Sequence, residues 1–317
     1  MATSHISKKY VSDCQHLQHY FSGNEASSSK KMMEILTSRK PEDYKLIRQT
    51  YSALYNSDLL YMLSGIKRHK NLAMVAYLRI CEPHERDAQS LRGGLVGSCV
   101  DLNTITEILC TRSTLDLQNV RQAYLTKYNA DIGQDVVLKT NGNTKEVFRA
   151  ILNSTRFSGA RVDASMAMCD AKMIYEAMES GKSIDRKTIF SIISQRNSGQ
   201  LKAILQAYKQ LYGHDFSQSL KQTKSGEFGK ELLVIIKCIQ YPEKHFAKQL
   251  QRAVEKGSAQ EALIRVVSTR AGSDIKGIKT AFSAKTGWSL ESLVRSEFSN
   301  TENGNGLVAD VLVGLLK

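Results

Sequence analysis

A skeleton of about 24 residues occurs four times in the chain, and this repetition limits the fold more than any other feature. Each copy has an arginine and, twelve positions later, an aromatic residue; three copies add a tyrosine four positions further on. The copies are Ile35–Asp58, Ile108–Asp131, Ile192–Asp215 and Val266–Ser289. Their arginines, Arg39, Arg112, Arg196 and Arg270, lie 73, 84 and 74 residues apart, and the aromatic residues keep the same separations. Four copies in step predict one body of stacked, similar units.

The spacing of apolar residues within the copies is helical. Ile189, Ile192 and Ile193 fall at i, i+3 and i+4, which places them on one face of a helix. Gly213 suits the end of a helix, and Pro83 and Pro242 suit the first turn of the helices that they open. The sequence therefore predicts an all-α fold, with four short helices and a connecting helix in each unit. The aromatic residue of each copy lies on the apolar stripe and is expected in the core.

The spacing of the copies also predicts the boundaries of the units. The larger middle separation places an insertion between the second and third units, and the small, polar stretch 154–165 suits this linker. The expected units are residues 15–82, 83–153, 166–241 and 242–316.

Composition points to an acidic partner and a cytoplasmic location. The 317 residues carry a net charge of +13, which favours attraction to nucleic acid or to an anionic membrane surface. The N-terminus has no apolar segment of the signal-peptide kind, and no apolar run reaches the length of a membrane span. The six cysteines include no CxxC pair and are expected to be buried, reduced thiols. Contact with membranes is therefore expected to be peripheral.

Several motifs together resemble one family. The I-L-x-x-R helix, the R-Q-x-Y-x-x-x-Y-x-x-D run and the four units are similar to annexins, and residues 83–88 (PHERDA) and 241–248 (YPEKHFAK) resemble plant annexins in particular. The resemblance implies four helical repeats stacked into one curved disc, whose convex face binds anionic phospholipid through calcium. Calcium takes six to eight oxygen ligands. In the family, a G-x-G-T-[D/E] loop and a carboxylate about forty residues later supply part of this set.

The corresponding loops of this chain depart from the family pattern. Windows 24–28, 97–101, 181–185 and 255–259 read NEASS, GSCVD, GKSID and EKGSA, and none of them matches. The resemblance leaves Gly257 with Glu297 in the fourth repeat, and Gly181 with Glu227 in the third, as candidate calcium ligands. Calcium at one or two such altered sites is the only cofactor implied. The alternative is that Gly257 only turns the chain and that Glu297 is a solvated acid.

Basic residues occupy the loops where the acids are missing. They are Lys30, Lys31, Lys67, Arg68, Lys70, Lys139, Lys145, Lys182, Arg186, Lys187 and Lys256. If the fold resembles annexins, these cations face lipid. A cation near an anionic surface contributes about 1 kcal/mol, screened by salt. The pattern suggests membrane binding that depends weakly or not at all on calcium. The alternatives are calcium-dependent binding through the fourth or third repeat, and charged loops that are simply solvated.

Three other classes of function are alternatives to membrane binding. A nucleic-acid partner is not expected, because no RNP, KH, zinc or basic-helix signature is present. An enzyme is not expected. His16 and His19, near Asp13 and Cys14, could form a metal or peroxidase-like site, but an ordinary pair of histidines on a helix surface is the preferred interpretation. A helical-repeat scaffold without a membrane role, with protein partners or self-association, stays open. Trp288 could serve such a scaffold as an exposed anchor, or could belong to the core.

Overall fold

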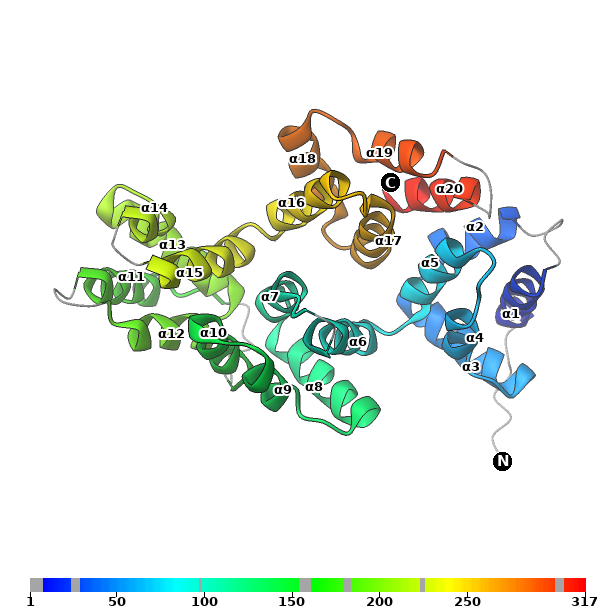
Figure 1. Cartoon of the computed structure of the whole chain (residues 1–317), viewed down its shortest axis with the longest axis horizontal. Helices are drawn as coiled ribbons and strands as arrows, with labels where there is room; N and C mark the ends of the chain where they lie inside the picture. The colour runs from blue at the N-terminus through cyan, green and yellow to red at the C-terminus, as the bar shows by residue number, and fades with distance from the viewer. Residues whose placement is uncertain are drawn as a thin grey trace. The chain divides into compact units, whose positions relative to one another are not determined.

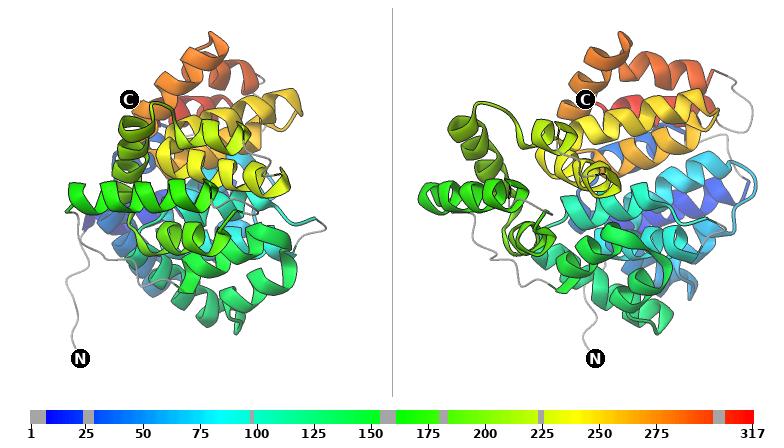
Figure 2. Two further views of the ribbon diagram at one scale, coloured as in Figure 1. Left: turned by 90° about the vertical axis from the view of Figure 1, so that its left-hand side faces the viewer. Right: turned by 60° about the vertical axis from the view of Figure 1, so that its left-hand side comes forward.

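The structure, a computed structural model, describes residues 8–23, 29–96, 99–153, 161–179, 184–222, 226–299 and 305–317. Over these ranges all regular elements are helices, twenty in number, which confirms the predicted all-α fold (Figures 1 and 2). The chain divides into two compact units. Unit 1 joins Met1–Pro83 to Glu243–Lys317, and unit 2 is His84–Pro242. Unit 1 thus combines the first and fourth expected repeats, and unit 2 combines the second and third.

Ten helices belong to each unit in the described part of the chain. Those of unit 1 are α1 (Lys8–Phe21), α2 (Ser29–Ser38), α3 (Pro41–Tyr55), α4 (Leu59–Ser64), α5 (Lys70–Ile80), α16 (Pro242–Glu255), α17 (Ala259–Arg270), α18 (Ile275–Thr286), α19 (Leu290–Glu297) and α20 (Asn305–Leu315). Those of unit 2 are α6 (Pro83–Val96), α7 (Leu102–Thr111), α8 (Thr114–Tyr128), α9 (Ile132–Lys139), α10 (Gly142–Asn153), α11 (Ala164–Glu179), α12 (Arg186–Gln195), α13 (Ser198–Tyr212), α14 (Phe216–Gln222) and α15 (Gly226–Gln240). The two prolines begin α6 and α16, as expected, and Gly213 ends α13 with a positive φ of 75°. Helix α11 begins at Ala164, one residue before the expected end of the linker.

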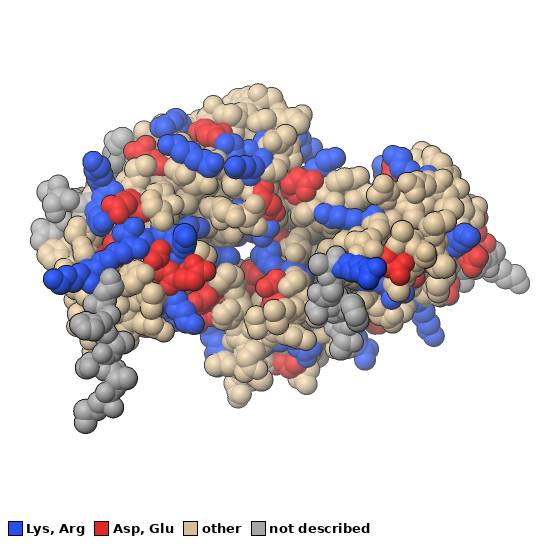
Figure 3. Space-filling model, turned by 180° about the vertical axis from the view of Figure 1, so that it is seen from behind, with Lys and Arg blue, Asp and Glu red and all other residues tan. Residues whose placement is uncertain are grey.

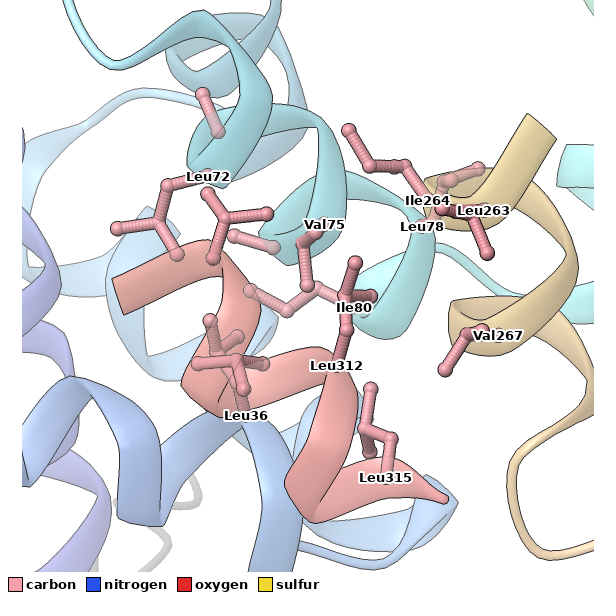
Figure 4. Packing of buried hydrophobic residues seen from close by; sticks show 14 of the residues in the cluster. Leu36, Leu72, Val75, Leu78, Ile80, Leu263, Ile264, Val267, Leu312 and Leu315 are labelled. Carbon is pink, nitrogen blue, oxygen red and sulfur yellow. The ribbon is translucent and has the colours of Figure 1, made fainter. Parts of the chain in front are cut away.

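The core of unit 1 is shared between its two repeats. Helix α5 packs against α17 and α20, and α2 packs against α20. Figure 4 shows the side chains that meet there: Leu36 of α2, Leu72, Val75, Leu78 and Ile80 of α5, Leu263, Ile264 and Val267 of α17, and Leu312 and Leu315 of α20. Because neither repeat encloses this core alone, the two repeats depend on each other for their burial of apolar surface.

The core of unit 2 is built in the same way. Helix α15 packs against α7 and α10, and α10 also packs against α12, so the second and third repeats interlock. The aromatic residues of the skeleton, Tyr51, Tyr124, Tyr208 and Phe282, are buried in both units, which confirms their predicted place in the core. Among the cysteines, Cys99 and Cys169 are exposed. The prediction of burial was wrong for these two, because each lies outside the apolar stripe of its segment.

The repeated arginines hold two helices of a repeat together. Arg39 Nε donates to Asp13 Oδ2 at 2.8 Å, and the same bond joins Arg112 to Asp87 at 2.6 Å and Arg196 to Asp170 at 2.7 Å. These three aspartates are buried on the first helix of their repeats. The hydrogen bonds that these guanidinium groups donate to the carboxylates raise the pKa of Arg39 and that of Arg196 above the ordinary value for arginine. We name this pairing the buried clamp.

The fourth repeat lacks the buried clamp. Arg270 Nε donates instead to Asp274 Oδ1 at 2.7 Å, four residues further along the chain. Its guanidinium carbon lies 4.9 Å from the centre of the Phe246 ring on α16, the helix that carries the acid in the other repeats. An aromatic face therefore replaces the carboxylate there.

Candidate functional site

Three loop segments of unit 1 meet around one glutamine. Asn71, near the start of α5, donates through Nδ2 to Gln260 Oε1 at 3.4 Å and to Asn305 Oδ1 at 3.1 Å. Gln260, at the start of α17, donates through Nε2 to the carbonyl oxygen of Glu297 at 2.6 Å. The bonds join the start of α5 in the first repeat to the start of α17, the start of α20 and the end of α19 in the fourth.

Unit 2 repeats this bridge with different chemistry. Arg186, at the start of α12, donates through a terminal guanidinium nitrogen to Asn143 Oδ1 at 2.8 Å. Arg186 and Gln260 both lie ten residues before the skeleton arginine of their repeat, and Asn143 and Asn71 are both the second residue of their helix. We name these two contacts the inter-repeat bridges. The bridge of unit 1 uses a neutral amide, and that of unit 2 uses a cation.

Two residues of helix α15 contact the residues at the cationic bridge. The guanidinium carbon of Arg186 lies 5.0 Å from the centre of the ring of Phe228, which is buried on α15. Glu231 of the same helix accepts a hydrogen bond from the Thr144 N–H at 3.1 Å, at the start of α10. The ring restricts the guanidinium on one face, and the carboxylate compensates the positive end of α10. Arg186 is thus a positioned cation, although it is exposed to solvent.

The carboxylates near this bridge are engaged as helix caps. Asp185 accepts a bond from the Thr188 hydroxyl at 2.7 Å and bonds from the N–H groups of Lys187 and Thr188 at 3.1 and 3.3 Å. These bonds, that of the Thr188 hydroxyl above all, lower the pKa of Asp185. Asp101 caps α7 in the same manner. Both carboxylates thus accept bonds from the N–H groups of their own helices.

The bridges bring together several of the predicted basic residues. In unit 2, Lys139 and Lys145 lie on the segment that contains Asn143, and Lys187 follows Arg186. In unit 1, exposed Lys67, Arg68 and Lys70 precede or flank Asn71, and exposed Lys256 lies in the turn before Gln260. Each unit therefore gathers four of the predicted cations around its bridge. Lysine and arginine side chains are interspersed with acidic ones on the face drawn in Figure 3.

The remaining predicted basic residues are placed differently. Lys30 is exposed on α2, whereas Lys31 forms an ion pair with Glu34 at 2.9 Å within that helix. Lys182 lies outside the described residues, as does Gly181. His69, in the middle of the first basic loop, is buried against Tyr20 with a ring-centre distance of 5.6 Å.

The candidate calcium ligands of the fourth repeat lie on segments that the structure joins. Gly257 has a φ of +70° and closes a turn after α16, in which the Ser258 N–H donates to Ala253 O at 2.9 Å. This turn alone accounts for the glycine. Glu297 is the last residue of α19, and its backbone carbonyl accepts a bond from Gln260 at the start of α17, the helix that follows the Gly257 turn. This bond connects the segment after the Gly257 turn to the end of α19.

The other predicted ligand pair is only half described. Glu227 is exposed in the first turn of α15, where a carboxylate stabilises the positive end of the helix. Within the described ranges, no group of three or more His, Cys, Asp or Glu side chains is arranged to hold a metal ion. In the first two repeats, lysine or arginine stands at the positions where the family pattern places a distal acid.

The residues of the enzyme hypothesis do not converge. Asp13 and Cys14 are buried on α1, where Asp13 binds Arg39 and the Cys14 thiol donates to the Ile47 carbonyl at 3.3 Å. Burial raises the pKa of that thiol to about 12, which makes it a poor nucleophile. His16 bonds through Nδ1 with the Ser12 carbonyl of its own helix, and His19 is exposed. The four side chains therefore form no common site.

Two features of the site were not predicted from the sequence. Asn71, Gln260 and Asn143 were not singled out, although the equal distance of Gln260 and Arg186 from the skeleton arginines is a signal in the repeat itself. Trp288, left open between core and surface, has 59% of its surface exposed, between α18 and α19. It is a surface residue.

Comparisons with known proteins agree with this architecture. The family model described as Annexin matches residues 86–151, 169–235 and 245–301. Human Annexin A13 is 32% identical over 269 residues, covering 84% of this chain and 85% of that protein. Annexin D2 of Arabidopsis thaliana is 31% identical over 306 residues, covering 96% and 94%. A solved structure of annexin III has a TM-score of 0.83 and 25% identity, covering 98% of this chain and 96% of that chain.

Proposed function

The chain belongs to the annexin family, and from this premise we propose that it binds the surface of anionic phospholipid membranes through basic loops, with little need for calcium. Members of the family generally bind phospholipid membranes in a calcium-dependent manner and are not enzymes. The observation that carries the proposal is the pair of inter-repeat bridges, each of which gathers basic residues from two repeats. In the family these loops carry the calcium ligands, and here the acids of the first two repeats are replaced by cations.

The strength of such binding follows from the number of cations. A lysine or arginine near an anionic bilayer contributes about 1 kcal/mol at physiological salt. Four cations around one bridge would together contribute about 4 kcal/mol, which corresponds to a dissociation constant of about 1 mM. The attraction falls as salt shortens the Debye length. A positioned guanidinium such as Arg186 also forms paired hydrogen bonds with phosphate oxygens.

A calcium-dependent mode through the fourth repeat is the second candidate. It is supported by the contact of Gln260 with the Glu297 carbonyl, which holds the end of α19 beside the start of α17. Here the Glu297 carboxylate and the carbonyls of the turn at Gly257 would hold the ion, and lipid oxygens would complete its shell. The third repeat, with Glu227, offers a weaker version of the same arrangement. Both modes would act at the membrane surface.

The described helices offer no alternative route into a membrane. Across the ranges that the structure covers, no helix combines the length and the apolar character that a bilayer span requires. We therefore propose that the association is peripheral.

Co-sedimentation with vesicles tests the proposed function. We expect the chain to bind vesicles of mixed phosphatidylserine and phosphatidylcholine in the presence of a calcium chelator. Binding should weaken as salt is raised, and should be nearly absent with phosphatidylcholine alone. Absence of binding in chelator, with strong binding restored by micromolar calcium, would overturn the proposal in favour of the calcium-dependent mode.

A charge-matched pair of variants locates the surface. Lys139→Gln with Lys187→Gln removes two cations from the loops of unit 2, and Lys172→Gln with Lys202→Gln removes two exposed cations from helices α11 and α13. The net charge changes equally. We expect the first pair to weaken binding in chelator about ten-fold or more and the second to change it less than two-fold. Equal effects would mean that only the net charge matters.

A further inference from the structure

The loops of the second repeat expose two leucines among the cations. Leu138, in the last turn of α9 and next to Lys139, has 76% of its surface exposed. Leu102, the first residue of α7, has 44% exposed. Both lie at the ends of their helices rather than on the stripe that faces the core of unit 2. An exposed leucine costs free energy in water and gains it when it finds an apolar surface.

The repeat predicts that these two leucines lie close together. In the fourth repeat, Gln260 at the start of α17 reaches the backbone of Glu297 at the end of α19. Counted from the skeleton arginine and aromatic residue, Leu102 stands at the position of Gln260, and Lys139 at that of Glu297. Helices α7 and α9 both pack against α10 in unit 2 (Figure 1). Leu138, one residue before Lys139, therefore lies at the same end of the repeat as Leu102.

This apolar pair is particular to the second repeat. The positions that correspond to Leu102 and Leu138 are Ser29 and Gly65 in the first repeat, and Gln260 and Ser296 in the fourth. In the third repeat, the position of Leu102 holds Arg186 of the cationic bridge. The second repeat thus has leucine at both of these positions, beside the cations Lys139 and Lys145.

We propose that Leu138 and Leu102 form an apolar anchor that enters the outer layer of an anionic bilayer, while Lys139, Lys145, Arg186 and Lys187 bind the headgroups around it. This inference rests on the proposed function and specifies how unit 2 carries it out. A lipid surface fits better than a protein partner because Lys139 directly follows the exposed Leu138, and because the bridge brings Arg186 to the segment of Asn143 that follows α9. The neighbouring carboxylates, Asp101 and Asp185, serve as helix caps. Apolar burial is not screened by salt, so the anchor predicts binding that persists when the charges are screened.

The test compares two exposed leucines of the same unit in the full-length chain. Leu115, the second residue of α8, has 62% of its surface exposed and follows the opposite end of α7 from Leu102. We expect Leu138→Asn to bind phosphatidylserine-containing vesicles about ten-fold more weakly than wild type in chelator, with a larger relative loss at high salt. Leu115→Asn should bind within two-fold of wild type. Binding of Leu138→Asn equal to that of wild type would overturn the inference and leave the proposed function standing.

A fluorescent residue reports the depth of the anchor directly. The chain has a single tryptophan, so Trp288→Phe combined with Leu138→Trp places the only indole at the anchor. We expect its emission to shift to shorter wavelength with vesicles and to be quenched by lipids brominated on their acyl chains. Unchanged emission on vesicles that do sediment with the protein would overturn the inference. Failure of wild type to bind any anionic vesicle would overturn the proposed function as well. Loss of self-association in Leu138→Asn, measured by light scattering, with vesicle binding unchanged would assign the leucine to a protein interface instead.

Discussion

Both units contain an inter-repeat bridge, but the side chain that forms it is neutral in unit 1 and positively charged in unit 2. In unit 1 the neutral side chain of Gln260 links the first basic loop to the end of α19, which carries Glu297. In unit 2 the bridge is the guanidinium of Arg186, placed over the ring of Phe228. The difference teaches that the helical frame fixes where the loops meet, whereas the residues in the loops decide whether a neutral amide or a cation occupies that place.

The frame itself also differs between the units. Both repeats of unit 2 have the buried clamp, as does the first repeat of unit 1. The fourth repeat has only the local pair of Arg270 and Asp274. In unit 1 the packing of α2 against α20 and of α5 against α17 also joins the two repeats.

Removing the acid of a buried clamp should have the largest effect on stability. Asp170→Ala leaves the Arg196 guanidinium without its partner and should lower the free energy of unfolding by about 3–5 kcal/mol. Asp274→Ala removes a more exposed, local partner and should cost at most about 1 kcal/mol. Urea denaturation followed by circular dichroism measures both. Losses of equal size would show that the clamp of unit 2 is no different from the local pair of the fourth repeat.

The clamp shows where prediction from sequence reaches its limit. The repeat gave the positions of the arginines, the helices and the buried aromatic residues, because helical periodicity and equal spacing are properties of the chain itself. The partners of the arginines lie 25 or 26 residues upstream on another helix, and Asp13, Asp87 and Asp170 carry no local signal that distinguishes them from surface acids. Only the packing of the two helices makes them partners.

Replacing a glycine between the two repeats of unit 1 should have the next largest effect on stability. A Cβ on Gly314 of α20 would lie 2.9 Å from Thr37 Cγ2 of α2. The Thr37 hydroxyl donates to the Met33 carbonyl at 2.7 Å, which fixes the side chain so that its methyl group cannot turn away. Gly314→Ala should therefore lower the free energy of unfolding by about 1–3 kcal/mol.

Gly93 of α6 provides the control in unit 2. Nothing lies within 4 Å of a Cβ built on this residue, and it lies inside a helix. Gly93→Ala should raise the free energy of unfolding by about 0.5–1 kcal/mol, because alanine loses less backbone entropy in a helix. Thermal unfolding of the two variants beside wild type gives opposite shifts of Tm. A stabilising Gly314→Ala would refute the tight contact between α2 and α20.

If the fourth repeat holds the ion, a substitution at its site in unit 1 should weaken calcium binding and a substitution in unit 2 should not. In calorimetric titrations with phosphatidylserine-containing vesicles present, Glu297→Gln should weaken calcium binding about ten-fold, or roughly 1.4 kcal/mol, because it removes the one carboxylate of that site. Arg186→Gln in unit 2 should leave calcium binding unchanged and weaken vesicle binding in chelator. Calcium binding that Glu297→Gln does not alter would exclude the fourth-repeat site.

The loops were predicted less completely than the frame for a physical reason. Sequence register predicted Lys139 and Lys145 at the positions of the distal acids of the second repeat, and Arg186 and Lys187 at the loop of the third, since each can be counted from the skeleton. It did not show that residues more than forty positions apart meet at one bridge, because Asn143 and Arg186 belong to different repeats. The exposure of Leu138 likewise depends on where α9 ends against its neighbours.

The smallest effect is expected from replacing an acid in the first turn of a helix, and each unit offers one such acid for comparison. Asp43 of α3 and Asp116 of α8 are both the third residue of their helices and accept a backbone N–H, that of Lys40 at 3.0 Å and that of Ser113 at 3.2 Å. Asp43 also accepts bonds from Tyr10 Oη at 2.7 Å and Lys9 Nζ at 3.1 Å, which attach α1 to α3. The bond from the Lys40 N–H and that from Tyr10 lower the pKa of Asp43 to about 2.

The lowered pKa fixes the direction of a pH dependence. Because Asp43 releases its proton more readily in the folded chain than in the unfolded chain, its stabilising effect is complete above the ordinary pKa of about 4 and is lost as pH falls through about 2. Asp43→Asn should thus cost about 1 kcal/mol at pH 7, and its stability should approach that of wild type as pH falls from 4 to 2. Hydrogen exchange should also show faster exchange in α1 of Asp43→Asn, whereas Asp116→Asn should affect only the start of α8. A difference between wild type and Asp43→Asn that stays constant down to pH 2 would contradict the assignment of this carboxylate as the attachment point of α1.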